Sequence, residues 1–384
     1  MFSRLTDEQT AIRDAVREFA QKEIAPHADQ WDEEHAFPRD IFRPMAEMGL
    51  AGLLAPEEYG GSQLPRLTGA LIYEELGKAD MGTAVWLSVH NMVTGAISRY
   101  GDDEQRTRWI PRLTSGDALG AFSLSEAHAG SDAANLQCAA RRDGDSYILN
   151  GSKFWVTNAG VADLYLVFAR TGAGYKRAHG VSAFLVGQGT PGFTIGKLER
   201  KMGLRASPTG ELLFDHCQIP ASNRLGAEGD GLKIALSGLD GGRINIAATA
   251  TGVAQAALDV ATNYAREREA FGKPIGAFEG IQFMLADMAM KVEASRLLVH
   301  QAAAAMDDGV PATQYAAMAK CFATDAAMAV TTDAVQVLGG AGYVRDWPVE
   351  RYMRDVKVAQ IFEGTNQIQR VVIARALLGS AASA

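Results

Sequence analysis

The spacing of apolar residues changes twice along the chain, and this change strongly limits the folds open to it. From residue 6 to about residue 116 the spacing is helical, as at Ile12, Val16 and Phe19, and Thr6 with Gln9 has the pattern of a capping box. Between about 119 and 225, short β-branched or aromatic runs alternate with Gly, Asn and Pro. From residue 232 onward the pattern is helical again and rich in alanine. The chain is therefore expected to fold in the order α, β, α.

The same patterns predict individual elements. Helices are expected at residues 39–48, 67–79, 83–100, 244–268, 281–306, 312–338 and 367–378, and strands at 147–149, 154–156, 164–168, 181–186 and 212–214. Asp143-Gly144 between two candidate strands predicts a β-hairpin. We expect a multidomain α and β protein, with a helical domain over 1–118, a β-barrel or β-sandwich over 119–230, and a helix bundle over 231–384.

Composition excludes several classes of protein. The net charge of −8 argues against a nucleic-acid surface, and the three cysteines form no CxxC pair that would indicate zinc. No apolar run reaches about 18 residues, so no membrane span is expected. The N-terminus has neither a signal peptide nor an Arg/Ser-rich presequence. We expect a cytoplasmic protein, or a mitochondrial matrix protein if a presequence has been removed.

Common catalytic motifs are missing from the sequence. It has no P-loop, no HExxH and no G-x-S-x-G, and its G-x-G-x-x-G at residues 187–192 lies within the strand-like region and does not open a helix, as a dinucleotide-binding motif would. Nicotinamide enzymes with a Rossmann fold, kinases, zinc proteases and serine hydrolases are therefore disfavoured, and no metal site is expected.

One carboxylate near the C-terminus is a candidate catalytic base. Glu363 lies between the apolar pair Ile361-Phe362 and Gly364. Apolar neighbours remove water from a carboxylate and raise its pKa, as a general base requires. From these residues alone, a surface glutamate in a turn before the last helix is favoured over a catalytic one.

Two further segments carry polar groups suited to a ligand. Residues 122–132 join hydroxyls, a carboxylate and glycine at the junction of the helical and strand-like regions. Such a loop offers hydroxyls and backbone N–H groups to a polar ring edge or a phosphate. Residues 150–158 place Trp155 two positions from the hydroxyl of Thr157, although a tryptophan that only fills the core is the simpler reading.

Together these segments resemble the acyl-CoA dehydrogenase family of flavoproteins. The resemblance runs nearly end to end, and its most specific parts are residues 336–343, 266–274 and 285–288. Residues 239–247 look like the short-chain and branched short-chain members, the isobutyryl type among them. The resemblance implies an N-terminal helical domain, a middle β-domain, a C-terminal four-helix bundle and an FAD cofactor bound without a Rossmann fold.

The resemblance also implies which residues hold FAD. Those expected to meet or cover the flavin are Phe122, Leu124, Ser125, Trp155 and Thr157. Those expected to reach the dinucleotide from a neighbouring subunit are Arg268, Phe271, Gln336 and Gly340. Thr365 and Gln367 would complete the site, and Ser131 would serve the phosphates of FAD or CoA.

By the same resemblance, Glu363 removes the α-proton of an acyl-CoA while the β-hydrogen leaves as hydride, giving a trans-2-enoyl-CoA. Some relatives carry this base at the position of Gly242, which has no side chain to act. The Glu363 N–H and a ribityl hydroxyl of FAD would hold the thioester carbonyl oxygen. The residues expected to contact the substrate are Ser131, Leu239, Asp240, Arg243, Gly364 and Arg375.

The family further implies partners and pathway. An electron-transfer flavoprotein would accept the electrons, and the chain would form a homo-oligomer, expected to be a tetramer, in β-oxidation or branched-chain amino acid catabolism. Two alternatives are an acyl-CoA oxidase that uses oxygen and a non-catalytic flavoprotein that binds nucleic acid. The chain departs from the family at Ala127-His128, where Pro-Gly is usual, and this affects the expected shape of the loop.

Overall fold

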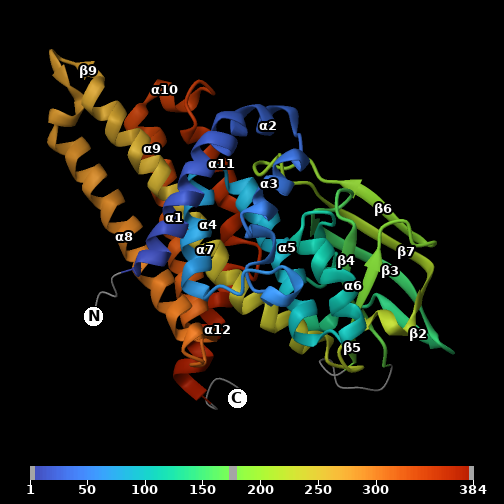
Figure 1. Ribbon diagram of the computed structural model, residues 1–384. Coiled ribbons are helices and arrows are strands. Elements are labelled where there is room, and N and C mark those ends of the chain that lie inside the picture. Colours follow the sequence, from blue (N-terminus) through green and yellow to red (C-terminus); the bar gives the residue numbers. More distant parts are fainter. Residues whose placement is uncertain (1–4, 173–179, 380–384) are drawn as a thin grey trace.

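The computed structural model describes residues 5–172 and 180–379. Its first part is helical, with α1 (Asp7–Phe19), α2 (Ala28–Glu34), α3 (Phe42–Glu47), α4 (Arg66–Ala79), α5 (Met81–Tyr100) and α6 (Asp103–Thr114) (Figure 1). Thr6 and Gln9 form the expected capping box at the start of α1. α4 and α5 confirm the helices predicted at 67–79 and 83–100, and both are buried along most of their length.

The middle of the chain forms one mixed β-sheet. Its strands are β1 (Gly120–Ser123), β2 (Ala139–Asp143), β3 (Ser146–Thr157), β4 (Leu164–Arg170), β5 (Val181–Gly187), β6 (Phe193–Leu198), β7 (Thr209–Pro220) and β8 (Arg224–Leu225). Their order is β6-β7-β3-β2-β4-β5-β8, with β1 parallel to β4. Apolar residues of α5 and α6 share one core with β4 and β5, so the helices cover one face of the sheet.

Two details of the sheet test the predictions. The hairpin expected at Asp143-Gly144 is confirmed, since Asp143 pairs with Ser146 and Gly144 takes φ 58°. Residues 147–149 and 154–156, expected as separate strands, are instead parts of β3, so that prediction was wrong. Gly151 (φ 133°) sits at an irregularity in the register with β7, which bends the strand without ending it.

The last part of the chain is a helix bundle. Its long helices are α7 (Gly231–Glu267), α8 (Glu279–Asp307), α9 (Thr313–Leu338) and α12 (Asn366–Leu378), joined by the hairpin β9 (Glu269–Ala270) and β10 (Lys273–Pro274) and by the short α10 (Gly340–Tyr343) and α11 (Val349–Val356). α7 packs against α4, α5, α8 and α9, which makes it the centre of the molecule. None of the described helices has an apolar stretch long enough to cross a bilayer.

The start of α7 was predicted wrongly. α7 begins at Gly231 and not at residue 244. Glycines before residue 244 usually disfavour a helix, but in this helix they lie at close packing contacts. A Cβ on Gly241 would lie 2.5 Å from Arg66 Nη1, and one on Gly242 would overlap the Glu363 carboxylate. Close packing therefore explains glycines that, read alone, indicate a loop.

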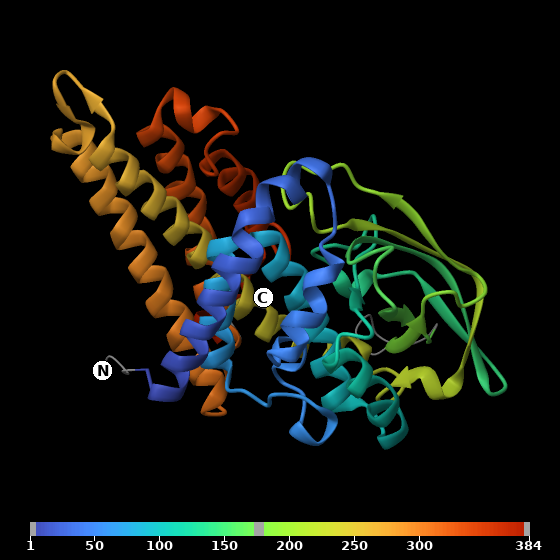
Figure 2. The same cartoon turned by 45° about the horizontal axis from the view of Figure 1, so that its top comes forward.

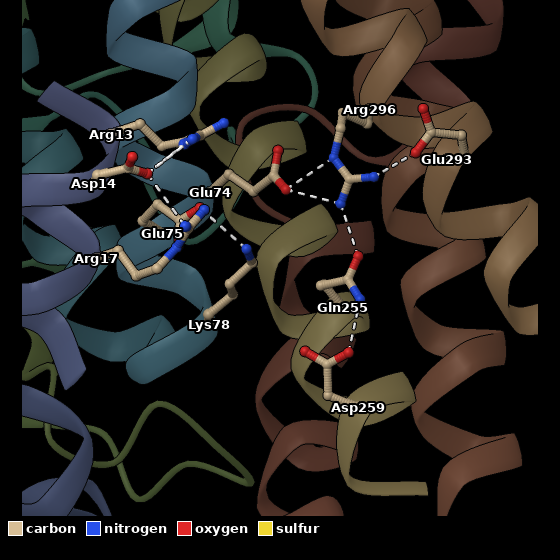
Figure 3. A network of polar contacts seen from close by, with 10 residues as sticks. All are labelled: Arg13, Asp14, Arg17, Glu74, Glu75, Lys78, Gln255, Asp259, Glu293 and Arg296. Carbon is tan, nitrogen blue, oxygen red and sulfur yellow. Dashed lines mark hydrogen bonds and ion pairs between the residues drawn. The ribbon is translucent and has the colours of Figure 1, made fainter. Parts of the chain in front are cut away.

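Charged side chains connect the N-terminal helices to the bundle (Figure 3). On α4, buried Glu75 accepts hydrogen bonds from Arg17 Nη2 at 2.9 Å and from Lys78 Nζ at 3.0 Å. Its neighbour Glu74 accepts from Arg296 Nε on α8 at 3.0 Å, and the Arg296 Nη2 donates to Gln255 on α7 at 2.8 Å. The network thus joins four helices, α1, α4, α7 and α8.

Candidate active site

Glu363 lies in a tight turn between α11 and α12 with its carboxylate enclosed. Its backbone is left-handed (φ 54°), and Gly364 continues the turn at φ 86°. Although the residue as a whole is partly exposed, Oε2 is buried and has no hydrogen-bond partner among the described residues. Burial raises the pKa of Glu363 to about 7, against the opposing effects of the positive charges of Arg243 and Lys320. An enclosed, unpaired carboxylate of this kind is suited to take up a proton.

Buried polar groups from α9 and α12 fix this turn. Lys320 Nζ donates to the Gly364 carbonyl at 2.8 Å and to Asn366 Oδ1 at 2.9 Å. Gln369 Nε2 donates to the carbonyls of Glu363 and Gly364 at 3.1 and 2.9 Å. Thr365 caps α12 by accepting a hydrogen bond from the Ile368 N–H at 3.3 Å. The carbonyl oxygens of the turn are therefore bonded to protein, while the side chain of Glu363 is not.

α7 approaches the carboxylate from the other side. The Glu363 carboxylate occupies the space that a Cβ of Gly242 would fill. Positions 242 and 363, at which members of the resembled family carry the base, are therefore in contact. The next residue of α7, buried Arg243, donates from Nη1 to Asp240 Oδ1 at 2.8 Å, and Thr313 donates to Asp240 Oδ2 at 2.7 Å. Two of the predicted substrate residues, Arg243 and Gly364, thus lie beside the candidate base, and a third, Asp240, is bonded to Arg243.

A cavity of about 370 Å³ opens beside this contact. It lies between α5, α7 and the segment after α3, and Gly242 forms part of its wall. Glu363 is not itself part of the lining, but it contacts Gly242, so the cavity lies next to the carboxylate. A cavity beside a candidate base is the candidate place for a substrate.

A second group of predicted residues lies where β1 and β3 meet. Trp155 is 61% exposed, and its backbone φ is 61°. Both the exposure and the positive φ are uncommon for a tryptophan. The Phe154 N–H donates to the Ser125 carbonyl at 2.9 Å, which places the loop after β1 against this strand. The hydroxyls of Ser125 and Thr157 have no hydrogen-bond partner in the part of the chain that the structure describes. An exposed indole beside two free hydroxyls fits a planar ring with polar edges. Leu124 is buried there, and Phe122 packs on Phe168 with ring centroids 4.9 Å apart.

A buried ion pair shapes the loop that carries Ser125. Lys153, fully buried, donates from Nζ to Glu126 Oε1 at 2.7 Å and to the Leu124 carbonyl at 3.1 Å. Glu126 and Ala129 also exchange backbone hydrogen bonds, so Ala127-His128 form a two-residue turn. The departure from Pro-Gly therefore leaves a closed turn at this point.

Other predicted residues lie apart from the site. The β9–β10 hairpin with Arg268 and Phe271, and the α9–α10 junction with Gln336 and Gly340, are at the end of the bundle distant from the sheet (Figures 1 and 2). Phe271 is 95% exposed. One chain therefore does not bring these four residues to Trp155. Ser131, Gln367 and Arg375 are also exposed, and Leu239 is half-buried.

The residues that support the turn were not predicted from the sequence; they are Lys320, Asn366 and Gln369. A signal for Lys320 was present, since it is a single lysine on the apolar, alanine-rich face of the helix predicted at 312–338. Its target, 44 residues further along the chain, could not be read from spacing.

With the fold and site described, the family follows from comparison with known proteins. Sequence models described as the N-terminal, middle and C-terminal domains of acyl-CoA dehydrogenase match residues 6–117, 121–217 and 229–378. The chain belongs to the acyl-CoA dehydrogenase family of oxidoreductases. The expected fold and family are thereby confirmed.

Individual members of the family are similar to this chain over nearly its whole length. The chain is 49% identical to an acyl-CoA dehydrogenase of Bacillus subtilis, over 98% of this chain and 99% of that protein. It is 44% identical to the mitochondrial isobutyryl-CoA dehydrogenase of Dictyostelium discoideum, over 97% of this chain and 90% of that protein. Among solved structures, butyryl-CoA dehydrogenase from Megasphaera elsdenii superposes with a TM-score of 0.95 and 44% identity, covering 98% of this chain and all of that one.

Proposed function

We propose that the protein oxidises a short or branched short-chain acyl-CoA to the trans-2-enoyl-CoA with FAD, and that an electron-transfer flavoprotein takes the electrons. The observation that carries this proposal is the enclosed, unpaired carboxylate of Glu363, which touches Gly242 on the wall of the cavity. The butyryl and isobutyryl relatives support a substrate with a four-carbon acyl group.

In this proposal Glu363 removes the α-proton of the thioester. Burial lifts the pKa of Glu363 to about 7, close to that of a proton acceptor suited to neutral pH. Arg243 and Lys320 oppose the shift and so keep a useful fraction of the carboxylate ionised. Lys320 and Gln369 hold the turn, so the carboxylate keeps its direction as the substrate binds.

The backbone of the same turn can hold the thioester oxygen. The Glu363 N–H donates to no group among the described residues, whereas the Phe362 N–H is bonded to the Val358 carbonyl at 3.0 Å. A free N–H next to the base can stabilise the negative charge that develops on the carbonyl oxygen when the α-proton leaves.

The features around Trp155 fit FAD, the cofactor that the family implies. The exposed indole would cover a ring, and the hydroxyls of Ser125 and Thr157 would bond its polar edge. When bound there, FAD would supply the chemistry that accepts the β-hydride. Arg268, Phe271, Gln336 and Gly340 lie too far away in one chain, so we propose that a second copy supplies them and that the protein is a homo-oligomer, with a tetramer expected.

Turnover with a panel of acyl-CoA thioesters tests this function. We expect the highest kcat/KM for butyryl-CoA or isobutyryl-CoA, with an electron-transfer flavoprotein or an artificial acceptor in place of oxygen. An optimum at eight carbons or more would contradict the proposed chain length. Faster turnover with oxygen than with the other acceptors would instead identify an oxidase.

A further inference from the structure

The cavity beside Glu363 is lined by two arginines and by no carboxylate among the described residues. Arg66, the first residue of α4, and Arg99, near the end of α5, both line it. None of the described residues that line the cavity is acidic. Two arginines therefore line one cavity in a chain whose net charge is −8.

Arg66 has no hydrogen-bonding partner for its side chain among the described residues. The carboxylate of Asp307 lies nearby, but its two oxygens accept the backbone N–H groups of Arg66 and Leu67 at 2.6 and 3.0 Å. Burial lowers the pKa of Arg66 and the charge of Arg99 adds to this effect, while Tyr73 and Asp307 oppose it. The guanidinium is half-buried and has no hydrogen-bonded anion among the described residues, so its donors are available to an anion that a ligand supplies.

The position of Arg66 connects it to the candidate active site. A Cβ on Gly241 would lie 2.5 Å from Arg66 Nη1, so the guanidinium lies against α7 at this glycine. The next residue of α7, Gly242, contacts the Glu363 carboxylate. Arg99 donates from Nη1 to Ser237 Oγ at 3.0 Å, so its guanidinium is held against α7 on the same cavity. Both arginines therefore lie along α7, close to the part of the helix that contacts Glu363.

We propose that Arg66, supported by Arg99, is a specificity-determining residue that binds an anionic group of the substrate in this cavity. The inference rests on the proposed acyl-CoA substrate. The group is either a phosphate of CoA or a carboxylate at the far end of the acyl chain, and in either case guanidinium donors bond its oxygens. Arginine suits this role because its planar donors match carboxylate and phosphate oxygens in pairs.

Binding of three unreactive thioethers to the FAD-loaded protein tests the proposal. S-butyl-CoA carries the phosphates, S-butyl-pantetheine lacks them, and S-(4-carboxybutyl)-CoA adds a terminal carboxylate. Their Kd values are measured by calorimetry for the wild-type protein, Arg66→Met and Arg66→Lys. Arg141→Met is the matched control, since it removes an exposed guanidinium from β2.

Loss of a charged hydrogen bond of about 1.5–3 kcal/mol weakens binding by about 10- to 150-fold. A loss of this size in Arg66→Met for both CoA ligands but not for S-butyl-pantetheine identifies a phosphate. A loss only for S-(4-carboxybutyl)-CoA identifies the acyl carboxylate. Arg66→Lys should retain part of the affinity, because it keeps the charge but not the paired donors.

Two results would overturn the proposal: unchanged Kd values for all three ligands, or an equal loss for all three including S-butyl-pantetheine. Melting temperatures of the variants separate a folding defect from a binding defect, and Arg66→Lys still tests the proposal if Arg66→Met does not fold. Failure of the wild-type protein to bind any CoA thioether would count instead against the proposed function.

Discussion

Glu363 adopts a left-handed backbone, an uncommon and costly conformation for a residue with a side chain. The hydrogen bonds from Lys320 and Gln369 to the carbonyls of the turn maintain that conformation. The result is a carboxylate held against Gly242 instead of facing solvent. At the scale of single residues, the chemistry depends on how this one side chain is enclosed.

The raised pKa of Glu363 predicts how the rate depends on pH. A base acts in its ionised form, so kcat/KM should rise about tenfold per pH unit below a pKa of about 7 and level off above it. Initial rates with butyryl-CoA between pH 5 and 9 measure this profile. A rate that is flat, or that falls as the pH rises through 7, would argue against Glu363 as the base.

Lys320 should position the base and adjust its pKa. In Lys320→Met the turn loses two hydrogen bonds and Glu363 loses a nearby positive charge. We expect kcat to fall by up to about 100-fold, as a misplaced group can cause, and the rising limb of the pH profile to move to higher pH. The same measurements on Lys22→Met, a change at an exposed site, provide the control. A lower kcat with an unmoved pH profile would leave Lys320 only a structural role.

At the scale of elements, α7 connects the domains because glycines let other groups approach it. Gly77 on α4 lies against the Thr249 backbone, and Gly252 on α7 lies against the Glu74 backbone, so α4 and α7 pack closely. Such contacts cannot be read from the helical pattern. Periodicity identified α4 and α5 well because their apolar positions are buried, but it placed the start of α7 too late.

The network between α1 and α4 makes a prediction about stability. Burial works against the charge of Glu75, but hydrogen bonds from Arg17 and Lys78 outweigh it, so the pKa of Glu75 is lowered from 4.5. Its stabilising effect is therefore present above pH 4.5 and fades as the pH falls below that value. Glu75→Gln should lower the free energy of unfolding by about 2 kcal/mol at pH 7 and by less at pH 4.

Urea unfolding at pH 7 and pH 4 measures this difference. Glu18→Gln on the exposed side of α1 is the control and should change the stability by less than about 0.5 kcal/mol. An equal effect of Glu75→Gln at both pH values would mean that its charge does not hold α1 to α4.

At the scale of the whole molecule, one chain does not bring together all of its residues that are expected to bind FAD. The β9–β10 hairpin extends away from the sheet, and Phe271 at its tip is 95% exposed (Figure 2). An exposed phenylalanine on a projecting hairpin is suited to contact another copy. The positions of Trp155 and Phe271 thus favour a cofactor shared between subunits.

Arg268→Met tests this arrangement. We expect FAD affinity of the apoprotein to fall by about tenfold or more, because the arginine would bond the pyrophosphate from the second copy. Titration of FAD, with the oligomeric state followed by sedimentation, measures both quantities, and Arg141→Met again serves as control. Unchanged FAD affinity in an intact oligomer would refute a role for Arg268 at the cofactor.

The order of domains and the hairpin at Asp143-Gly144 were predicted from the sequence and are confirmed, because each depends on local pattern or on a family motif. The family motif also singled out Glu363, which we propose as the base. The sequence did not reveal Lys320 or Arg66, whose roles depend on partners far along the chain. Lys320 donates a hydrogen bond to the Gly364 carbonyl. The Arg66 side chain lacks a carboxylate partner among the described residues because Asp307 accepts the backbone N–H groups of Arg66 and Leu67 instead. Such pairings exist only once the helices are packed.

The most direct test of the account is the reduction of bound FAD by butyryl-CoA in a single turnover without oxygen. The wild-type protein should lose its oxidised-flavin absorbance rapidly. Glu363→Gln, shown by its spectrum to retain FAD, should do so about 10²–10⁴ times more slowly, the usual contribution of a positioned base. Equal rates for the two proteins would contradict the assignment of Glu363, and with it the central claim.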